Sequence, residues 1–211
     1  MKKKLLAGLA TGVFIVGMAG LSSATTLNVE KRDGIPYQVL GTESASDLIT
    51  AFNSMTFVSS TNVTQFVSIF PDNGTLLTLN FDLAVSSIWD FRIGPDWGTG
   101  GGVISDNSLV ALVVDDRWWA NNWDASGEVV TTENFTLGAG QHTIQWLGFE
   151  NCCSGGMTVQ FKPDAANAWS NLSLIAFDNA LPAAPVPEPA TMLLLGTGLV
   201  GLVGARRKKK A

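Results

Sequence analysis

The sequence has few of the residues on which common catalytic and metal-binding motifs depend. It has one histidine, His142, and two cysteines, Cys152 and Cys153, which are adjacent. It therefore contains no His-Glu-x-x-His or Cys-x-x-Cys motif, and Gly-x-Ser-x-Gly is absent as well. The glycine-rich run 98–102 lacks the lysine and helix that follow a phosphate-binding loop. We expect a protein that is not an enzyme. Carboxylates are numerous, so a secreted hydrolase acting on glycans remains the alternative, although nothing marks a catalytic pair.

Cations are also scarce between the two ends of the chain. The whole chain has 13 basic and 18 acidic residues. Three lysines lie in residues 1–24 and five cations in residues 206–210, which leaves five basic residues against all 18 acidic ones in 25–189. The net charge of that part is about −13. Such a surface repels nucleic acid and anionic lipid, and it favours solubility and cation binding.

Residues 1–24 have the layout of a secretory signal peptide. Lysines follow the first methionine, an apolar run extends over 5–21, and a Ser-Ser-Ala segment ends at Ala24. Glycines interrupt the apolar run and small residues end it, which is typical of a cleaved signal. We expect cleavage after Ala24, and the alternative is a retained membrane anchor.

A second hydrophobic segment lies near the C-terminus. Residues 190–205 are apolar and uncharged, and a basic tail, 206–211, follows them. As a helix this run would span about 24 Å, slightly less than a hydrocarbon core of about 30 Å, and bilayer thinning can absorb the difference. Clustered cations stay in the cytoplasm. We therefore expect a transmembrane helix in the inner membrane, with the preceding chain outside.

A proline-rich linker, 181–189, precedes that segment and ends in Pro187-Glu188-Pro189. Prolines make such a linker stiff and extended. Pro-Glu-Pro, an apolar helix and a terminal basic cluster, in this order, resemble the PEP-CTERM sorting signal. The resemblance implies a Gram-negative producer, an exosortase that cleaves at or near Pro187, Glu188 and Pro189, and delivery to an exopolysaccharide-bearing surface or biofilm.

Residues 25–180 form one domain in our interpretation, and its pattern is all-β. Short alternating runs rich in Val, Ile, Thr, Phe and Trp recur between turn signals, which is typical of an antiparallel β-sandwich. We expect one short helix at 46–53 and a hairpin that joins 134–137 to 141–149. The expected strands are 55–60, 64–70, 76–81, 87–93, 109–114, 129–135, 142–149, 157–162 and 172–177.

Within this domain, three features resemble the CCXG family of PEP-CTERM proteins. They are a Trp-Gly followed by the glycines 100–102, a later Trp-Trp pair, and the segment Glu150-Asn151-Cys152-Cys153-Ser154-Gly155. Cysteines that are neighbours in sequence lie about 3.8 Å apart at Cα, which is below the usual disulfide range, so a bond between Cys152 and Cys153 would be strained. In an oxidising compartment we expect that vicinal disulfide, with free thiols or intermolecular bridging as the alternatives.

The runs 91–94, 105–115 and 139–144 are similar to protective-antigen-like β-sandwich modules, which occur in carbohydrate-binding adhesins. The resemblance implies a jelly-roll or protective-antigen-like sandwich. In lectin-type members, two adjacent acidic residues before a strand hold Ca²⁺ and through it the sugar. Asp106 and Asn107 stand at the matching position, with asparagine where the family has a second aspartate. An Asp-Asn pair is also ordinary turn chemistry.

Asp115 and Asp116 form the other adjacent acidic pair and are the second candidate for a Ca²⁺ site. Trp118, Trp119 and Trp123 follow them, with asparagines between. Aromatic faces beside Asp and Asn suit sugar rings, and the same residues could equally fill a core. We therefore expect a surface or matrix protein with exopolysaccharide as the candidate ligand and these tryptophans as its platform.

Overall fold

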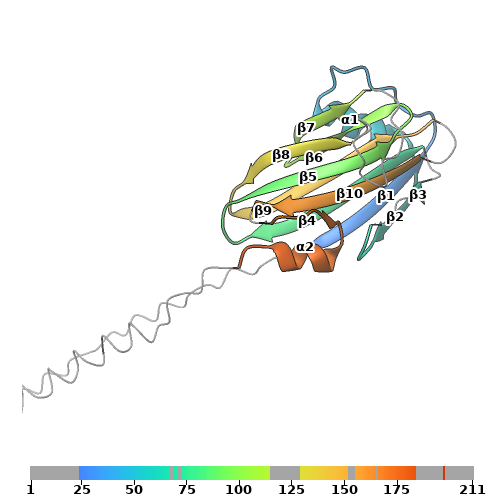
Figure 1. Ribbon diagram of the computed structural model, residues 1–211. Helices are drawn as coiled ribbons and strands as arrows, with labels where there is room; N and C mark the ends of the chain where they lie inside the picture. Colours follow the sequence, from blue (N-terminus) through green and yellow to red (C-terminus); the bar gives the residue numbers. More distant parts are fainter. Residues whose placement is uncertain are drawn as a thin grey trace, which may run out of the picture.

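The computed structural model describes residues 24–66, 69–70, 73–114, 129–151, 155–164, 166–183 and 197. They form an all-β protein of two antiparallel sheets that pack face to face, with a helix near each end (Figure 1). The predicted β-sandwich is therefore confirmed. In chain order the elements are β1 (Thr26–Asp33), α1 (Ala45–Ser54), β2 (Thr56–Asn62), β3 (Ile69–Phe70), β4 (Gly74–Leu83), β5 (Ser87–Asp96), β6 (Gly100–Ser105), β7 (Ser108–Val113), β8 (Val130–Leu137), β9 (Gly140–Phe149), β10 (Gly155–Pro163), β11 (Ser170–Asn171) and α2 (Leu174–Ala180).

The first sheet has six strands in the order β2-β1-β4-β9-β6-β7. The second has the order β11-β10-β5-β8, and β3 pairs with β10. Strands that are distant in sequence are paired over long stretches: β4 pairs with β9 from Gly74 opposite Phe149 to Leu83 opposite Gly140. The two central strands therefore run the full length of the sandwich side by side.

The main core lies between the two sheets. Ile144 and Trp146 of β9 point into it, as the alternation of β9 predicts, and they meet Trp89, Phe91 and other buried residues of the second sheet. Fully burying an aliphatic or aromatic side chain of this kind contributes about 1.5–3 kcal/mol. These buried rows hold the two sheets together.

A second, smaller core covers the outer face of the first sheet. Leu147 and Phe149 of β9 point to that face and pack beneath Leu48 and Phe52 of α1. Because β9 is buried on both faces here, its sequence loses the clean alternation of a half-exposed strand. Arg32 of β1 fixes the end of the helix, since its Nη1 donates to the carbonyl oxygens of Asn53 and Met55 at 3.0 and 3.2 Å.

The glycine-rich run 98–102, which lacks the lysine and helix of a phosphate-binding loop, contributes to packing. Gly101 and Gly148 lie opposite each other on β6 and β9. The indole of Trp97, only 3% exposed, lies across both, and a Cβ at either glycine would overlap the Trp97 ring. These two positions therefore need a residue without a side chain.

The strand register defines two ends of the sandwich. The loop end comprises the segments 33–45, 73–74, 96–100, 113–114 and 149–151. The tail end comprises 24–26, 83–87, 105–108, 137–140, 163–170 and α2. Gly74 lies opposite Phe149 and Arg32 at the loop end, whereas Leu83 lies opposite Gly140 at the tail end. Figure 1 shows α1 near the loop end and α2 at the tail end.

Four sequence-based expectations about the elements were wrong or incomplete. Residues 172–177 were expected to form a strand, but α2 begins at Leu174, where Ser173 caps it by accepting the backbone N–H of Ala176 at 3.2 Å. A short apolar run does not distinguish strand from helix by periodicity. Of the described residues in the expected strand 64–70, which are 64–66 and 69–70, only Ile69–Phe70 form a strand. The strands β1 and β6 were not expected.

The expected hairpin of 134–137 and 141–149 was also wrong. Strand β8 pairs with β5, and β9 pairs with β4 and β6, so the turn at 138–140 crosses from one sheet to the other. Gly140 adopts a φ of 122°, which a residue with a side chain rarely does. Short connection length alone does not decide which strands pair. The expected helix is confirmed as α1, capped by Ser44.

In the described part of the chain, no helix combines the length and the apolar character that crossing a membrane requires. The segment 190–205, expected to be transmembrane, lies outside that part except for Thr197. The signal segment also lies outside it, except for Ala24.

Candidate functional site

A groove of about 450 Å³ lies at the loop end, between α1 and the segment that leads into it. Its walls carry one aromatic ring, exposed hydroxyls, two carboxylates and aliphatic carbon. The lining residues are Tyr37, Leu40, Thr42, Glu43, Asp47, Thr50, Ala51 and Ser54.

Glu43 shapes the first wall by folding the backbone around its carboxylate. One oxygen accepts the N–H of Leu40 at 2.7 Å, and the other accepts those of Gly41 and Thr42 at 2.8 and 3.0 Å. Burial alone would raise the pKa of Glu43, but these backbone donors outweigh burial, and the pKa is lowered. Glu43 is therefore an ionised structural anion near neutral pH.

Asp47 shapes the second wall as part of the helix cap. Its Oδ2 accepts hydrogen bonds from the hydroxyl and the backbone N–H of Ser44, at 2.6 and 2.9 Å. The Ser44 oxygen accepts the N–H of Asp47 in return, which completes a capping box. The Ser44 hydroxyl and backbone bonds lower the pKa of Asp47. Both carboxylates of the groove are thus held in their charged form.

Tyr37 forms the aromatic part of the groove. Its ring packs on Phe149 with a centroid distance of 5.6 Å, and its hydroxyl donates to Oε1 of Glu43 at 3.4 Å. Burial and the nearby Glu43 carboxylate raise the pKa of Tyr37, so the hydroxyl stays protonated. Thr42 and Thr50 expose their hydroxyls, and Leu40 is 72% exposed at the rim. Hydroxyls, a ring and apolar carbon suit a polyhydroxylated ligand, and the two fixed charges disfavour an anionic one.

The groove lies beside the point where the predicted tryptophan segment begins. Val39 donates its N–H to the carbonyl of Thr99 at 3.0 Å, and a Cβ at Gly41 would lie 3.5 Å from the side chain of Val114. Val114 directly precedes the predicted site residues of this segment, which lie outside the described residues. These residues are Asp115, Asp116, Trp118, Trp119 and Trp123.

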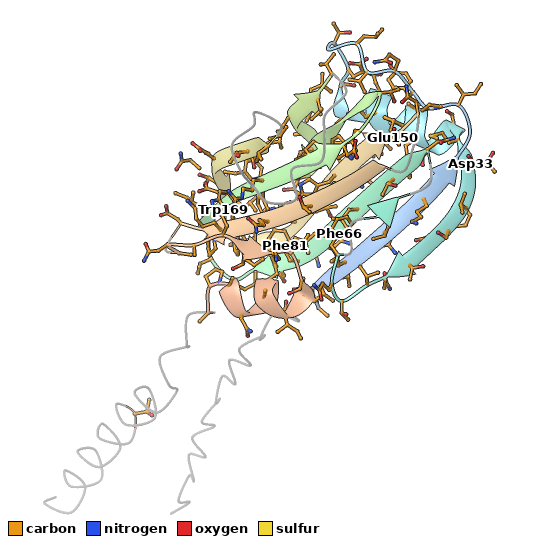
Figure 2. The ribbon with its side chains drawn as sticks, turned by 45° about the vertical axis from the view of Figure 1, so that its right-hand side comes forward. Asp33, Phe66, Phe81, Glu150 and Trp169 are labelled. Carbon is orange, nitrogen blue, oxygen red and sulfur yellow. The ribbon has the colours of Figure 1, made fainter. Side chains whose placement is uncertain are left out.

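Glu150, labelled in Figure 2 with Asp33, and Asn73 tie the other loops of the loop end together. The carboxylate of Glu150 accepts the N–H of Gly98 at 3.0 Å, and its backbone N–H donates to the carbonyl of Asn73 at 3.0 Å. The amide of Asn73 donates to Oδ1 of Asp33 at 3.1 Å. Cys152 and Cys153 come two and three residues after Glu150 and lie outside the described residues, so their disulfide stays a prediction.

Asp106 and Asn107 lie at the opposite end of the molecule from the groove. They form the turn between β6 and β7, with φ of 47° and 67°, the conformation that aspartate and asparagine tolerate best after glycine. Asp116 follows β7 at its other end. Strand β7 has six residues and extends about 20 Å. Of the two acidic pairs expected to bind Ca²⁺, one precedes this strand in the sequence and the other follows it.

The carboxylate of Asp106 is already occupied by protein donors. Its Oδ1 accepts the N–H of Thr143 at 2.8 Å, and its Oδ2 lies 2.7 Å from Nδ1 of His142. A Ca²⁺ ion would have to share these oxygens with the two donors, and it needs six to eight oxygen ligands in all. Within the described ranges, no three His, Cys, Asp or Glu side chains are grouped as metal ligands. Calcium binding at Asp106 and Asn107 therefore stays a prediction that this geometry does not favour.

Sequence reasoning did not find the groove, because none of its residues belongs to a ligand-binding motif. The available signal was Ser44-x-x-Asp47 before an apolar run, which marks a helix start but not a ligand site. Tyr37 and Glu43 contribute through tertiary contacts that no local pattern shows.

Comparison with solved structures finds domains of similar architecture. The PA14 sugar-binding domain from an RTX adhesin is 10% identical over 72% of this chain and 97% of its own, with a TM-score of 0.48. The PA14 domain of the antifreeze protein MpAFP is 9% identical over 72% and 90%, also at 0.48. The epithelial adhesin 9 A domain from Candida glabrata, in complex with Galβ1-4GlcNAc, is 11% identical over 71% and 86%, at 0.45. No curated protein matches the sequence.

The family comparison confirms the predicted sorting motif near the C-terminus. The model of the PEP-CTERM protein-sorting motif matches residues 185–208, which include Pro187, Glu188 and Pro189. The match covers the linker end, the apolar run and most of the basic cluster. The chain carries the PEP-CTERM sorting motif and is an exported protein that is processed at the membrane.

Proposed function

We propose that this chain is an exported cell-surface or extracellular-matrix protein whose domain binds neutral carbohydrate in the groove at its loop end, without catalysis. One observation carries the proposal. The chain leaves the domain from the tail end, where α2 ends at Ala180, and the sorting motif begins at residue 185. The groove lies at the other end, so a chain held at its tail presents the groove outward.

The chemistry of the groove supports a neutral ligand. Thr42 and Thr50 offer hydroxyls that can donate and accept, and Tyr37 offers a ring edge. The ionised carboxylates of Glu43 and Asp47 would repel a uronic acid or a sulfated sugar. The proposal includes the predicted platform of Trp118, Trp119 and Trp123, because Val114, from which that segment continues, lies next to the groove.

The same carboxylates count against glycan hydrolysis in this groove. A glycosidase needs one carboxylic acid that stays protonated near neutral pH, so its pKa must be raised. The pKa of Glu43 and that of Asp47 are both lowered, by hydrogen-bond donors that favour the charged form. Neither residue suits the role of general acid, which favours binding over turnover.

Affinity electrophoresis of the protein through gels that contain a neutral or an anionic polysaccharide tests the proposal. Dextran and galactomannan serve as neutral probes and alginate as the anionic one. We expect retardation by a neutral polymer, weakened about 5–30-fold in Thr50→Val, as loss of about 1–2 kcal/mol of hydrogen bonding implies. The matched control is Thr136→Val, an exposed threonine of β8 at the tail end.

Two outcomes would contradict the proposal. Equal retardation of Thr50→Val and the wild type would place any binding outside the groove. Release of reducing sugar that disappears in Glu43→Gln would favour the hydrolase alternative.

A further inference from the structure

Strand β2 is an edge strand with open surroundings. It pairs with β1 along one side, and no described strand pairs with its other side. Six of its seven residues are exposed, although they alternate between the two faces of the sheet. Phe57 is 57% and Val58 48% exposed. The open side of β2 therefore offers unpaired backbone groups flanked by apolar side chains.

The sequence around β2 is unusual for this chain because it carries no charge. No Asp, Glu, Lys or Arg occurs from Leu48 to Pro71, whereas the rest of 25–189 has 18 acidic and five basic residues. Natural edge strands are commonly guarded against pairing by a charged residue, especially lysine, or by proline. β2 has neither, and of the other guards it has one, a bulge at Val58 opposite the Lys31–Arg32 step of β1, which leaves the stretch from Ser59 to Asn62 regular.

We propose that β2 pairs in antiparallel fashion with β2 of a second copy of this chain, which joins the two six-stranded sheets into one continuous sheet. A two-fold axis makes such an interface self-complementary, because the same strand serves on both sides. Pairing through an exposed sheet edge is an established mode of association between chains.

Charge is the reason to expect a second copy as the partner. Two domains of about −13 each repel wherever their acidic surfaces meet. The uncharged edge is a place where they can approach without opposing like charges. A strongly basic or acidic partner would gain nothing from this neutral strand. The segment instead suits another neutral strand with hydroxyl and apolar side chains, such as itself.

The antiparallel arrangement determines the orientation of the two copies relative to each other. β2 runs from the loop end, where Thr56 lies opposite Asp33, toward the tail end, where Asn62 lies opposite Asn28. In an antiparallel pair, the loop end of one copy lies beside the tail end of the other. The two tails then leave in opposite directions, so two copies whose tails lie in one membrane cannot pair this way. Pairing fits copies released from the membrane or held on two facing surfaces.

A charge-pair experiment at Ser60 tests the proposal directly. Ser60 is exposed, on the part of β2 beyond the bulge. We expect the wild-type full-length chain, purified in mild detergent, to sediment as a dimer. With the two-fold axis beside Ser60 in the regular stretch of β2, Ser60→Lys and Ser60→Glu should each be monomeric, because like charges then meet across the axis. An equimolar mixture of the two variants should dimerise again, because unlike charges then meet.

The matched control is Thr131→Lys, an exposed position on β8, the edge strand of the second sheet. It should dimerise like the wild type. Melting curves followed by circular dichroism check that all variants fold. A monomeric wild type at tens of micromolar, dimers that persist in both Ser60 variants, or a mixture that stays monomeric would each overturn the proposal. A monomeric chain that binds a different protein through Ser60 would overturn it as well.

Discussion

Oδ2 of Asp106 lies 2.7 Å from Nδ1 of His142, whose other ring nitrogen lies 2.8 Å from the carbonyl oxygen of Gly138. The one histidine of the chain thereby bridges the turn at 105–108 and the turn at 137–140. Its ring also packs on Phe81, with a centroid distance of 5.6 Å. The acidic turn residue that resembled a calcium ligand has a structural partner within the domain.

Replacing Asp106 by alanine distinguishes a structural role of its carboxylate from a role as a calcium ligand. The change removes two hydrogen bonds of a carboxylate that is 44% exposed, so we expect a loss of about 1 kcal/mol in the free energy of unfolding. Denaturant unfolding, followed by tryptophan fluorescence, should show the same loss in 1 mM Ca²⁺ and in chelator. A wild type that gains stability from Ca²⁺, when Asp106→Ala does not, would instead support the calcium site.

Replacing Gly148 by alanine should destabilise the protein strongly. The new Cβ would overlap the indole of Trp97, and neither group can move far within a packed core. We expect a loss of about 2–4 kcal/mol in the free energy of unfolding, measured by thermal or urea denaturation. Gly138→Ala is the control, because no heavy atom lies within 4 Å of a Cβ at that position. Equal stability of the two variants would contradict the role assigned to Trp97.

The ion pair of Asp90 and Lys162, with Nζ 2.8 Å from Oδ2, predicts how stability depends on pH. Burial alone would raise the pKa of Asp90, but Lys162 and the N–H of Asn134 outweigh it and lower the pKa. A carboxyl with a lowered folded-state pKa stabilises the protein above its unfolded pKa, about 4 for aspartate. That contribution is lost as the pH falls through the folded value.

Lys162→Met removes the cation that lowers this pKa. The variant should lose about 1 kcal/mol near neutral pH and less once the pH has fallen through the lowered pKa of Asp90, so its unfolding free energy falls less steeply with acid. Urea unfolding from about pH 7 to pH 2 measures the difference. Glu133→Gln, an exposed change on β8, serves as the control. An unchanged acid profile in Lys162→Met would show that the pair contributes nothing.

Replacing Pro187, Glu188 and Pro189 by alanines should leave export intact and block removal of the tail. The motif match at 185–208 and the stiff Pro-Glu-Pro segment motivate this expectation. Immunoblots of membrane and extracellular fractions, with one epitope in the domain and one at the C-terminus, measure it. The variant should stay in the membrane fraction with both epitopes. Normal processing of the variant would refute the assignment of these residues to cleavage.

The sequence predicted the features that depend on local pattern. Alternation of apolar and polar residues identified most strands, and the helix expected at 46–53 is α1, which begins one residue earlier and ends one residue later, with its cap at Ser44 and not at the expected Ser46 or Asp47. The sorting motif was recognisable because its three parts are contiguous. Alternation within 141–149 predicts Ile144 and Trp146 on one face and Leu147 on the other, and in the structure Ile144 and Trp146 share the inner core while Leu147 packs under α1.

Features that depend on tertiary contacts could not be predicted. β6 is a strand whose first three residues are glycines, and Trp97 explains one of them, Gly101, only when β9 with Gly148 is placed beside β6. α2 contains an apolar run that fits either structure, and the contacts of Phe177 with the rings of Phe81, Trp89 and Phe161 cannot be read from the local sequence. The groove requires Glu43 to turn back on its own backbone, which no spacing rule shows.

The positions of the two ends have a mechanical consequence. If a ligand holds the groove and a surface holds the tail, a pulling force acts on the domain at two points, one near α1 and one near α2. The β4–β9 ladder runs between these points, and its hydrogen bonds are perpendicular to the pulling force. The force would therefore load these bonds together in shear rather than break them one at a time. At the exit, Phe177 is held by the rings of Phe81, Trp89 and Phe161, with centroids 4.9–5.0 Å away. The domain is therefore built to carry load along its length.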